Sequence, residues 1–375
     1  MNCFRTYKIS VTGIKLLAVC FTGLLLCTFT NAQNLQNDSL KIDYQKINSY
    51  TLDGNVMPAL RILGSYDSDK LSAKDLKFKT LFENRYKYTI DKSDFMDSRK
   101  SPVSDLLELY TGYWRESLLD NSKNYDSVIV KNLSAFLSAK FSIPIKNKDI
   151  YPDDTLDYYL KKYISSKGLH TTGFGRTGKY FDLLVWKNQK DTVYNFSIYS
   201  EKINTPVIFM TDFITLGWEE YATLEKAYPG GWATREALFC VRKAYDLRSE
   251  DFLIRYLCHE GRHFTDYKLF PKLSSADLEY RAKLTELSLL NKELFKIIYS
   301  FIQNANQDSK NGHSVANYCV IRDLSRALFH VNFEKEMGKW EKLSIEKINE
   351  AAFEALEVNT KILKRQGANV ENFIK

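Results

Sequence analysis

Residues 259 to 263 read His259-Glu260-Gly261-Arg262-His263, an HExxH sequence. Residues four positions apart lie on one face of an α-helix, so His259 and His263 can hold one metal ion between them. Glu260 is turned roughly 100° from His259, which brings its carboxylate within reach of a water molecule at that metal. The stretch therefore predicts two metal ligands and a general base, the residues of metal-assisted hydrolysis.

The residues before the motif favour a helix. Ser249 is a suitable N-cap, and Glu250 and Asp251 place negative charge in the first turn. Apolar residues from 252 to 257 predict a buried helical face, and no Pro or Gly interrupts the segment before Gly261. We therefore expect the motif on a buried helix. The competing interpretation is two histidines packed on a helix face without a metal.

A catalytic zinc ion usually has a third protein ligand. Residues 264–269 lack the Gly and the third His of the sequence HExxHxxGxxH, so the ligand must come from a later element. A break at 270–275 precedes a segment, 276–287, that predicts a second helix capped by Ser274 or Ser275. That helix carries two candidate ligands.

The two candidates are Glu279 and Glu286, which lie seven positions apart and face the same way. An HExxH helix followed by a helix with a ligand Glu resembles the gluzincins, the thermolysin-like zinc peptidases. The resemblance implies Zn²⁺ bound by His259, His263 and Glu279, with Glu260 as catalytic base. Glu279 is preferred because it lies near the start of the second helix and because Ala282 matches a small residue of gluzincin ligand helices. The spacing is shorter than in thermolysin, so Glu286 stays an alternative.

Further polar residues accompany the motif. Asp266 is expected on the same helix face as His263, as a ligand, as a partner that orients an imidazole, as an anchor of the helix pair, or as a solvated acid without a role in the site. The resemblance also implies a His or Tyr donor to the oxyanion beyond the third ligand. His313, at a predicted loop-to-helix junction, is the first candidate, and Tyr318 is the second.

The N-terminus has the features of a signal peptide. Basic residues precede an apolar run over 16–29 that is short for a membrane span, and Thr30-Asn31-Ala32 is a small-x-small cleavage sequence. Residues 1–32 are therefore the predicted signal peptide. We expect an exported protein, periplasmic or secreted, with no stable membrane span after cleavage.

Composition excludes several classes of protein. The predicted signal peptide holds three basic residues and no acid, so its removal lowers the formal net charge from +7 to +4. That charge is too small to predict a nucleic-acid partner. Three cysteines remain, Cys240, Cys258 and Cys319, and this odd number excludes a fully paired disulfide framework. Folding must depend on core burial.

Periodicity predicts an α+β fold that is mostly helical. Residues 33–168 are expected to form an N-terminal helical region, and 169–375 a zincin-like metallopeptidase region with C-terminal helices. Within the latter, 180–186 and 192–199 predict a strand pair joined by a turn at 187–191, and 207–210 a third strand. We expect these to form a small antiparallel sheet before the HExxH helix. Either its edge aligns an extended substrate, or the sheet is structural and has no substrate role.

Residues 173–178 match the pattern GxGxxG, but a phosphate-binding loop needs a strand before it and a helix after it. Here a helix end precedes the glycines and a strand follows, so we expect an ordinary loop. The function predicted from the sequence is an exported zinc metallopeptidase acting on a peptide or protein substrate. Two alternatives stay open: a zinc-dependent amide or ester hydrolase of a non-protein substrate, and a non-enzymatic exported helical binding protein.

Overall fold

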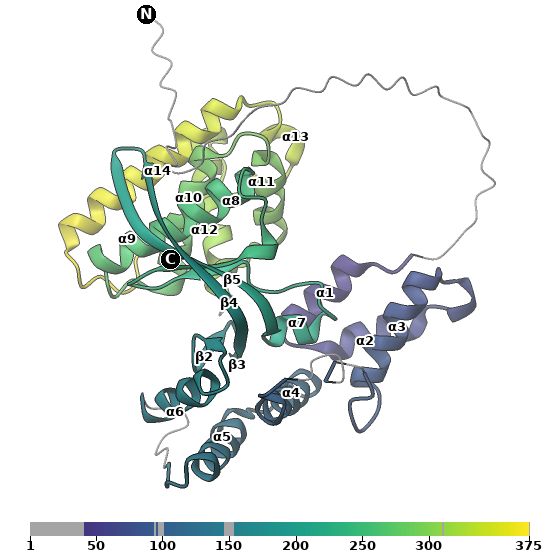
Figure 1. Ribbon diagram of the computed structural model, residues 1–375. Helices are drawn as coiled ribbons and strands as arrows, with labels where there is room; N and C mark the ends of the chain where they lie inside the picture. The colour runs from purple at the N-terminus through teal and green to yellow at the C-terminus, as the bar shows by residue number, and fades with distance from the viewer. Residues whose placement is uncertain (1–40, 94, 97–100, 146–153, 310, 375) are drawn as a thin grey trace, which may run out of the picture. The chain divides into compact units, whose positions relative to one another are not determined.

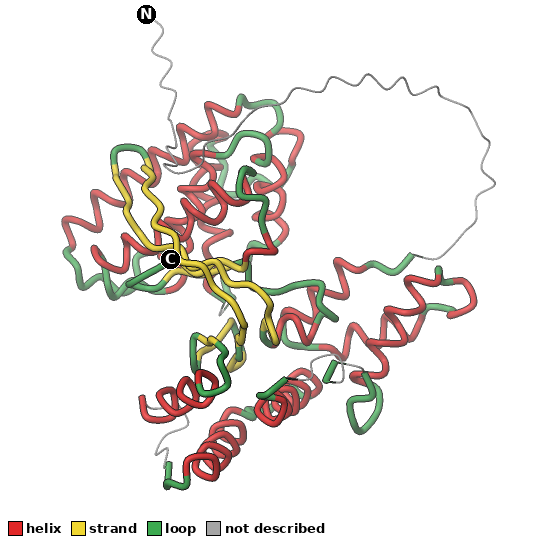
Figure 2. Tube along the Cα trace, viewed as in Figure 1, coloured by secondary structure: helices red, strands yellow, loops and turns green. Residues whose placement is uncertain are grey.

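The computed structural model describes residues 41–93, 95–96, 101–145, 154–309 and 311–374 (Figure 1). The predicted signal peptide and its cleavage site lie outside these residues. The described chain is mixed α+β and mostly helical, as predicted (Figure 2). None of its helices is long and apolar enough to cross a membrane.

The chain divides into two compact units. The described parts of 41–188, together with 212–229, form one unit, called here the helical unit. Residues 189–211 and the described parts of 230–375 form the other, called here the motif unit because it contains HExxH. The strands β4 (Leu184–Ile198) and β5 (Glu201–Leu216) contribute residues to both units.

The helical unit is built from amphipathic helices around an aromatic core. Trp114 is fully buried in this core, and its indole N–H donates to the carbonyl of Phe181 at 2.9 Å. The helices of the unit are α1 (Tyr44–Leu52), α2 (Val56–Ser65), α3 (Ala73–Tyr86), α4 (Ser104–Leu119), α5 (Asp126–Phe141), α6 (Asp154–Ser165) and the short α7 (Trp218–Ala222). Helices α1 to α6 all lie within the region 33–168 that the periodicity predicts to be helical.

The GxGxxG stretch belongs to a small antiparallel strand pair in this unit. It contains β2 (Gly175–Thr177), which pairs with β3 (Tyr180–Asp182). Gly178 lies in the turn between them with a φ of +56°, a conformation that glycine adopts without strain. No helix follows the glycines, so the strand-loop-helix context of a phosphate-binding loop is absent at this stretch, and part of the predicted loop is the strand β2.

The main sheet has five strands in the order β1-β4-β5-β7-β6. Its short strands are β1 (His170–Thr171), β6 (Gly231–Ala233) and β7 (Leu238–Val241). The sheet precedes the HExxH helix, as predicted. It is mixed rather than purely antiparallel, because β7 pairs parallel with β5 and antiparallel with β6. The short strand β6 therefore forms one edge of the sheet.

The predicted turn at 187–191 is wrong. These residues lie inside β4, and the turn is at Tyr199-Ser200, where Tyr199 has a φ of 55°. Residues 187–191 are all exposed, so no buried face imposes an alternating pattern on them. From Tyr194 to Ile198 one face of β4 is covered, and there the alternation is visible in the sequence.

The motif helix runs without a break from Glu250 to Leu269 and changes its winding before His259. It consists of α8 (Glu250–Phe252), a π-helical segment η4 (Leu253–Cys258) and α9 (His259–Leu269). Ser249 caps its start by accepting from the N–H of Phe252, as predicted. A π-helical segment directly before a functional residue is a frequent feature of active sites.

Helix α10 (Ser275–Leu289) is the centre of the motif unit. It packs against α9 and against two later helices, α12 (Gly312–Phe329) and α14 (Ile345–Gln366). Ser274 is its N-cap and accepts from the N–H of Asp277. The short α13 (Met337–Trp340) and α11 (Leu294–Gln303) complete the unit. Because neighbours cover α10 on every side, charged residues on it are held inside the protein.

Candidate metal centre

His259 and His263 face one another on α9, one turn apart. Their Nε2 atoms are 3.1 Å apart, and the ring centroids are 4.7 Å apart with nearly perpendicular planes. The two residues are only 8% and 6% exposed. The helix predicted from HExxH therefore brings two imidazole nitrogens to one point.

Glu279 on α10 joins the two histidines. Its Oε1 lies 3.3 Å from the Nε2 of His263, and its Oε2 lies 3.7 Å from the Nε2 of His259. Ligand atoms of the three residues all lie within 4.8 Å of one another, and all three residues are buried. Lys283, one turn further along α10, places its Nζ 3.7 Å from Glu279 Oε2. Glu279 is thus an enclosed carboxylate and not an exposed helix charge.

Glu286 reaches the same histidine from the opposite side. Its Oε1 forms a short hydrogen bond with Nδ1 of His259, and the Nε of Arg255 lies 3.8 Å from its Oε2. A carboxylate in this position accepts the Nδ1 proton of His259, which leaves the lone pair on Nε2. Of the two glutamates considered for the third ligand, Glu279 lies beside both Nε2 atoms, and Glu286 orients one imidazole.

The charges around the histidines favour a bound cation. Burial lowers the pKa of His259, but the carboxylates of Glu286, Glu279 and Glu260 outweigh this effect and raise it to about 9. Burial raises the pKa of Glu279, but hydrogen bonds from His263 and His313, with the charges of His259 and Lys283, hold it well below its usual range. Three convergent acceptors, two nitrogens and one oxygen, are the donor set that Zn²⁺ takes in catalytic sites. The residues therefore fit a divalent metal ion.

A buried ion pair fixes α9 against α10. Asp266, fully buried, accepts two hydrogen bonds from Arg281, at 2.7 and 2.9 Å. The same guanidinium donates to Asn359 at 2.6 Å and to Thr360 at 3.0 Å, both on α14. Of the roles considered for Asp266, anchoring the helix pair agrees with these contacts. Arg281 lies between Glu279 and Glu286 on α10. This ion pair therefore also fixes where both glutamates lie along the axis of α9.

Gly261 lets α9 approach the sheet closely. A Cβ atom at this position would lie 2.6 Å from Cζ of Phe196 on β4 and 3.3 Å from Cδ1 of Ile203 on β5. Gly261 is therefore a packing requirement within the motif, because any larger residue would push the histidine helix away from the strands that support it.

Glu260 lines a cavity of about 240 Å³ beside the histidines. Trp232 and Ala233, both on the edge strand β6, contribute to the wall. The complete lining is Trp232, Ala233, His259, Glu260, His263, Tyr267, Ser275, Leu278, Glu279 and His313. The two histidines, the acid beside them and the edge of the sheet thus open into one space.

His313 also reaches this space. It lies in the first turn of α12, and its Nδ1 is 2.9 Å from Oε2 of Glu279, while its side chain stays 62% exposed. The second candidate, Tyr318, does not line the cavity and stacks on Phe333 at 5.3 Å. Of the two, only His313 is brought to the proposed metal ligands.

One lining residue, Tyr267, was missed in the sequence. Tyr267 follows His263 by four positions, and its ring stacks on that imidazole at 6.3 Å, so the helical spacing could have identified it. The turn-rich aromatic stretch around Trp232 predicts either the rim of a cleft or a well-packed loop, and the structure places Trp232 on β6 in the cavity wall. That position depends on the order of strands in the sheet, for which the sequence holds no local pattern.

Comparisons with protein-family models, with curated proteins and with solved structures find no match to this chain. The geometry of His259, His263 and Glu279 therefore carries the metal site.

Proposed function

We propose that this protein is an exported zinc-dependent metallopeptidase of gluzincin type. The observation that carries the proposal is the buried convergence of His259, His263 and Glu279 beside the cavity that Glu260 lines. The non-enzymatic alternative is a binding protein with an accidental HExxH, in which a proton on His259 pairs with Glu279 and Glu286 in place of a metal.

In this mechanism His259, His263 and Glu279 would hold the metal, and Glu286 keeps His259 in the tautomer that can bind it. Zn²⁺ supplies Lewis acidity, which polarises a carbonyl group and acidifies water. Glu260 takes the proton from the attacking water and passes it to the leaving amine. His313, exposed at the start of α12, donates to the developing oxyanion.

A peptide is the preferred substrate because of the position of β6. This strand ends the order of the main sheet, and its residues Trp232 and Ala233 line the cavity. An extended peptide can pair with such an edge through its main chain, which places a peptide bond beside the catalytic groups.

The size of the cavity favours a second candidate. At about 240 Å³ it is smaller than most pockets for drug-sized ligands, which suits a zinc-dependent amide or ester hydrolase of a small, non-protein substrate. A library of blocked peptides and a library of small amides and esters distinguish the two, because a hydrolase of small substrates would cleave only the second.

Zinc content and Glu260→Gln test the proposal together. Purified residues 33–375 should carry about one zinc per chain by elemental mass spectrometry, and His259→Ala should lose it. Glu260→Gln should keep the zinc and lose roughly 10²- to 10⁴-fold in turnover, the contribution of a general base. Absence of zinc after remetallation would refute the metal site. Full activity of Glu260→Gln would refute the role of Glu260 while leaving the metal site intact.

Export completes the proposal. It depends on the signal peptide predicted over 1–32, which would be removed before Gln33. Mass spectrometry of the protein from the cell envelope or medium should find a mature N-terminus at Gln33, and an intact N-terminus in the cytoplasm would contradict it.

A further inference from the structure

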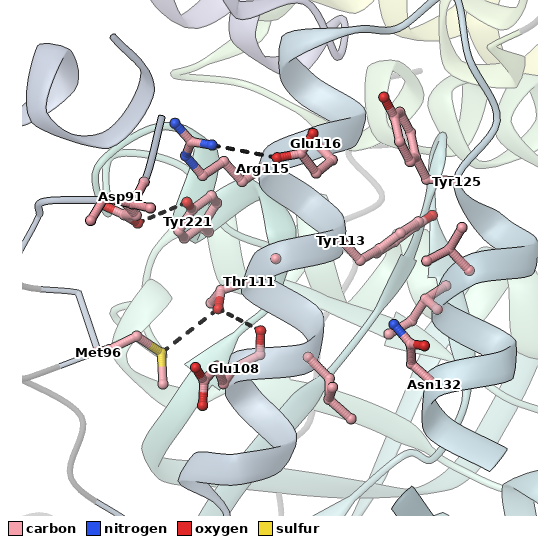
Figure 3. A pocket seen from close by; sticks show the side chains of 15 residues that line it. Asp91, Met96, Glu108, Thr111, Tyr113, Arg115, Glu116, Tyr125, Asn132 and Tyr221 are labelled. Carbon is pink, nitrogen blue, oxygen red and sulfur yellow. Dashed lines mark hydrogen bonds and ion pairs between the residues drawn. The ribbon is translucent and has the colours of Figure 1, made fainter. Parts of the chain in front are cut away.

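A second cavity, of about 550 Å³, lies in the helical unit over one face of α4. Its floor is α4, one wall is the segment after α3, and the other is the start of α5 (Figure 3). The apolar side chains that line it include Ile90, Leu109 and Val128, and Ile90 and Val128 are 67% and 49% exposed. Its volume lies in the range of ligand-binding pockets.

Gly112 is exposed in the middle of the floor. A Cβ atom at this position would meet no atom of the described residues within 4 Å. Glycine weakens a helix at an interior position, and nothing described in the fold uses the space that it leaves. That space admits the backbone of another molecule close to α4.

Two exposed carboxylates flank Gly112. Glu108 lies one turn before it and Glu116 one turn after it, on the same face of α4. The Glu116 side chain is 55% exposed, with Arg115 at 3.5 Å as an ion-pair partner. Eight residues of helix separate these two glutamates by about 12 Å along the axis.

The remaining charged groups of the cavity are engaged in the fold. Arg115 donates to the carbonyls of Arg85 and Thr89, which lie at and beyond the end of α3. Asp91 accepts from the hydroxyl of Tyr221 at 2.9 Å. These contacts hold the wall after α3 in place, and Tyr113 ties α4 to the start of α5 by donating to Asp126 at 2.7 Å. The groove is therefore formed before any ligand arrives, and the glutamates that it exposes, Glu108 and Glu116, are negative (Figure 3).

We propose that this groove binds an extended peptide segment with basic side chains at its first and fifth positions and an apolar side chain at its third. In an extended chain, alternate side chains share a face and positions one and five are about 13 Å apart, which matches the separation of Glu108 and Glu116. The apolar side chain then lies over Gly112, against Leu109 and Val128. This site does not depend on the metal centre and is independent of the proposed peptidase activity.

The test uses a fluorescent, blocked pentapeptide with lysine at positions one and five, leucine at position three and serine between them. Its anisotropy is measured with the full mature chain carrying Glu260→Gln, so that the probe is not cleaved. We expect saturable binding that weakens with added salt, because exposed charge pairs are screened. Gly112→Leu should weaken it at least 10-fold by filling the groove, and Glu108→Gln with Glu116→Gln should do the same.

Gly64→Leu is the matched control, because Gly64 is an exposed helical glycine of the same unit that also has open space around its Cβ position. It should leave binding unchanged. Leucine favours a helix more than glycine does, so circular dichroism should show Gly112→Leu folded. Unchanged binding by Gly112→Leu, or equal binding of a peptide with serine in place of both lysines, would overturn the proposal.

Discussion

Replacing Glu286 by glutamine tests how the protein prepares His259 for a metal. The Glu286 carboxylate accepts the Nδ1 proton of His259 and so directs the Nε2 lone pair toward His263 and Glu279. Glutamine keeps the length of the side chain but removes the charge that holds the proton on Nδ1. Loss of such a supporting carboxylate typically weakens metal affinity by about 10- to 100-fold, or roughly 1.4–2.7 kcal/mol.

The matching change at Glu279 should weaken zinc binding more than the change at Glu286. Glu279→Gln removes the charged oxygen that lies beside both Nε2 atoms, so zinc affinity should fall further than in Glu286→Gln. Competition with a chromophoric chelator gives the zinc dissociation constant of each variant. Glu350→Gln, an exposed acid on α14, is the control and should bind zinc as the wild type does.

Two outcomes would refute this reasoning. If Glu286→Gln bound zinc as tightly as the wild type, Glu286 would not set the tautomer of His259. If it lost more affinity than Glu279→Gln, Glu286 would be the third ligand and the present assignment would be reversed.

Two further predictions concern stability. Gly261→Ala should destabilise the fold by overpacking against Phe196, which costs about 1–3 kcal/mol, less about 1 kcal/mol gained in helix propensity. In a Phe196→Leu background, the loss of unfolding free energy caused by Gly261→Ala should be smaller by about 1 kcal/mol. If the effects of the two substitutions were additive in a double-mutant cycle, the clash with Phe196 would be contradicted. Burial raises the pKa of Asp182 to about 6, so between pH 4 and 6 the folded protein holds a proton there that the unfolded chain releases. The free energy of unfolding should fall by up to about 3 kcal/mol as pH rises through this window. Asp182→Asn still accepts from the N–H groups of Trp218 and Leu183 at Oδ1 and should lose this pH dependence in urea melts, whereas an unchanged slope would contradict the assignment.

The local parts of the site follow from the sequence. The four-residue spacing of His259 and His263 needs only a helix, and Ser249 with the apolar run behind it provides one. Ser274 likewise predicts the start of α10, which carries both candidate glutamates. These predictions succeed because helix periodicity and caps act over one or two turns, within which the chain's geometry is fixed.

The choice between Glu279 and Glu286 was decided by tertiary structure. Both glutamates face α9. Which of them meets the Nε2 atoms depends on the position of α10 along the axis of α9. The buried ion pair between Asp266 and Arg281 sets that axial position, and Arg281 also donates to Asn359 on α14. No local pattern encodes such a contact, because it joins helices far apart in the chain.

In the sheet, too, local features are predictable from the sequence and long-range strand pairing is not. The alternation from Tyr194 to Ile198 is readable because one face is buried, whereas residues 187–191 are exposed and read as a turn. The parallel pairing of β5 with β7, which makes β6 an edge beside the cavity, is also not local. The sequence by itself determined the two candidate metal ligands of one helix and the α+β composition. Packing between distant segments decided which glutamate lies beside the two histidines, the wall formed by Trp232 and the approach of His313. Side chains meet there only after the hydrophobic core has placed their helices and strands.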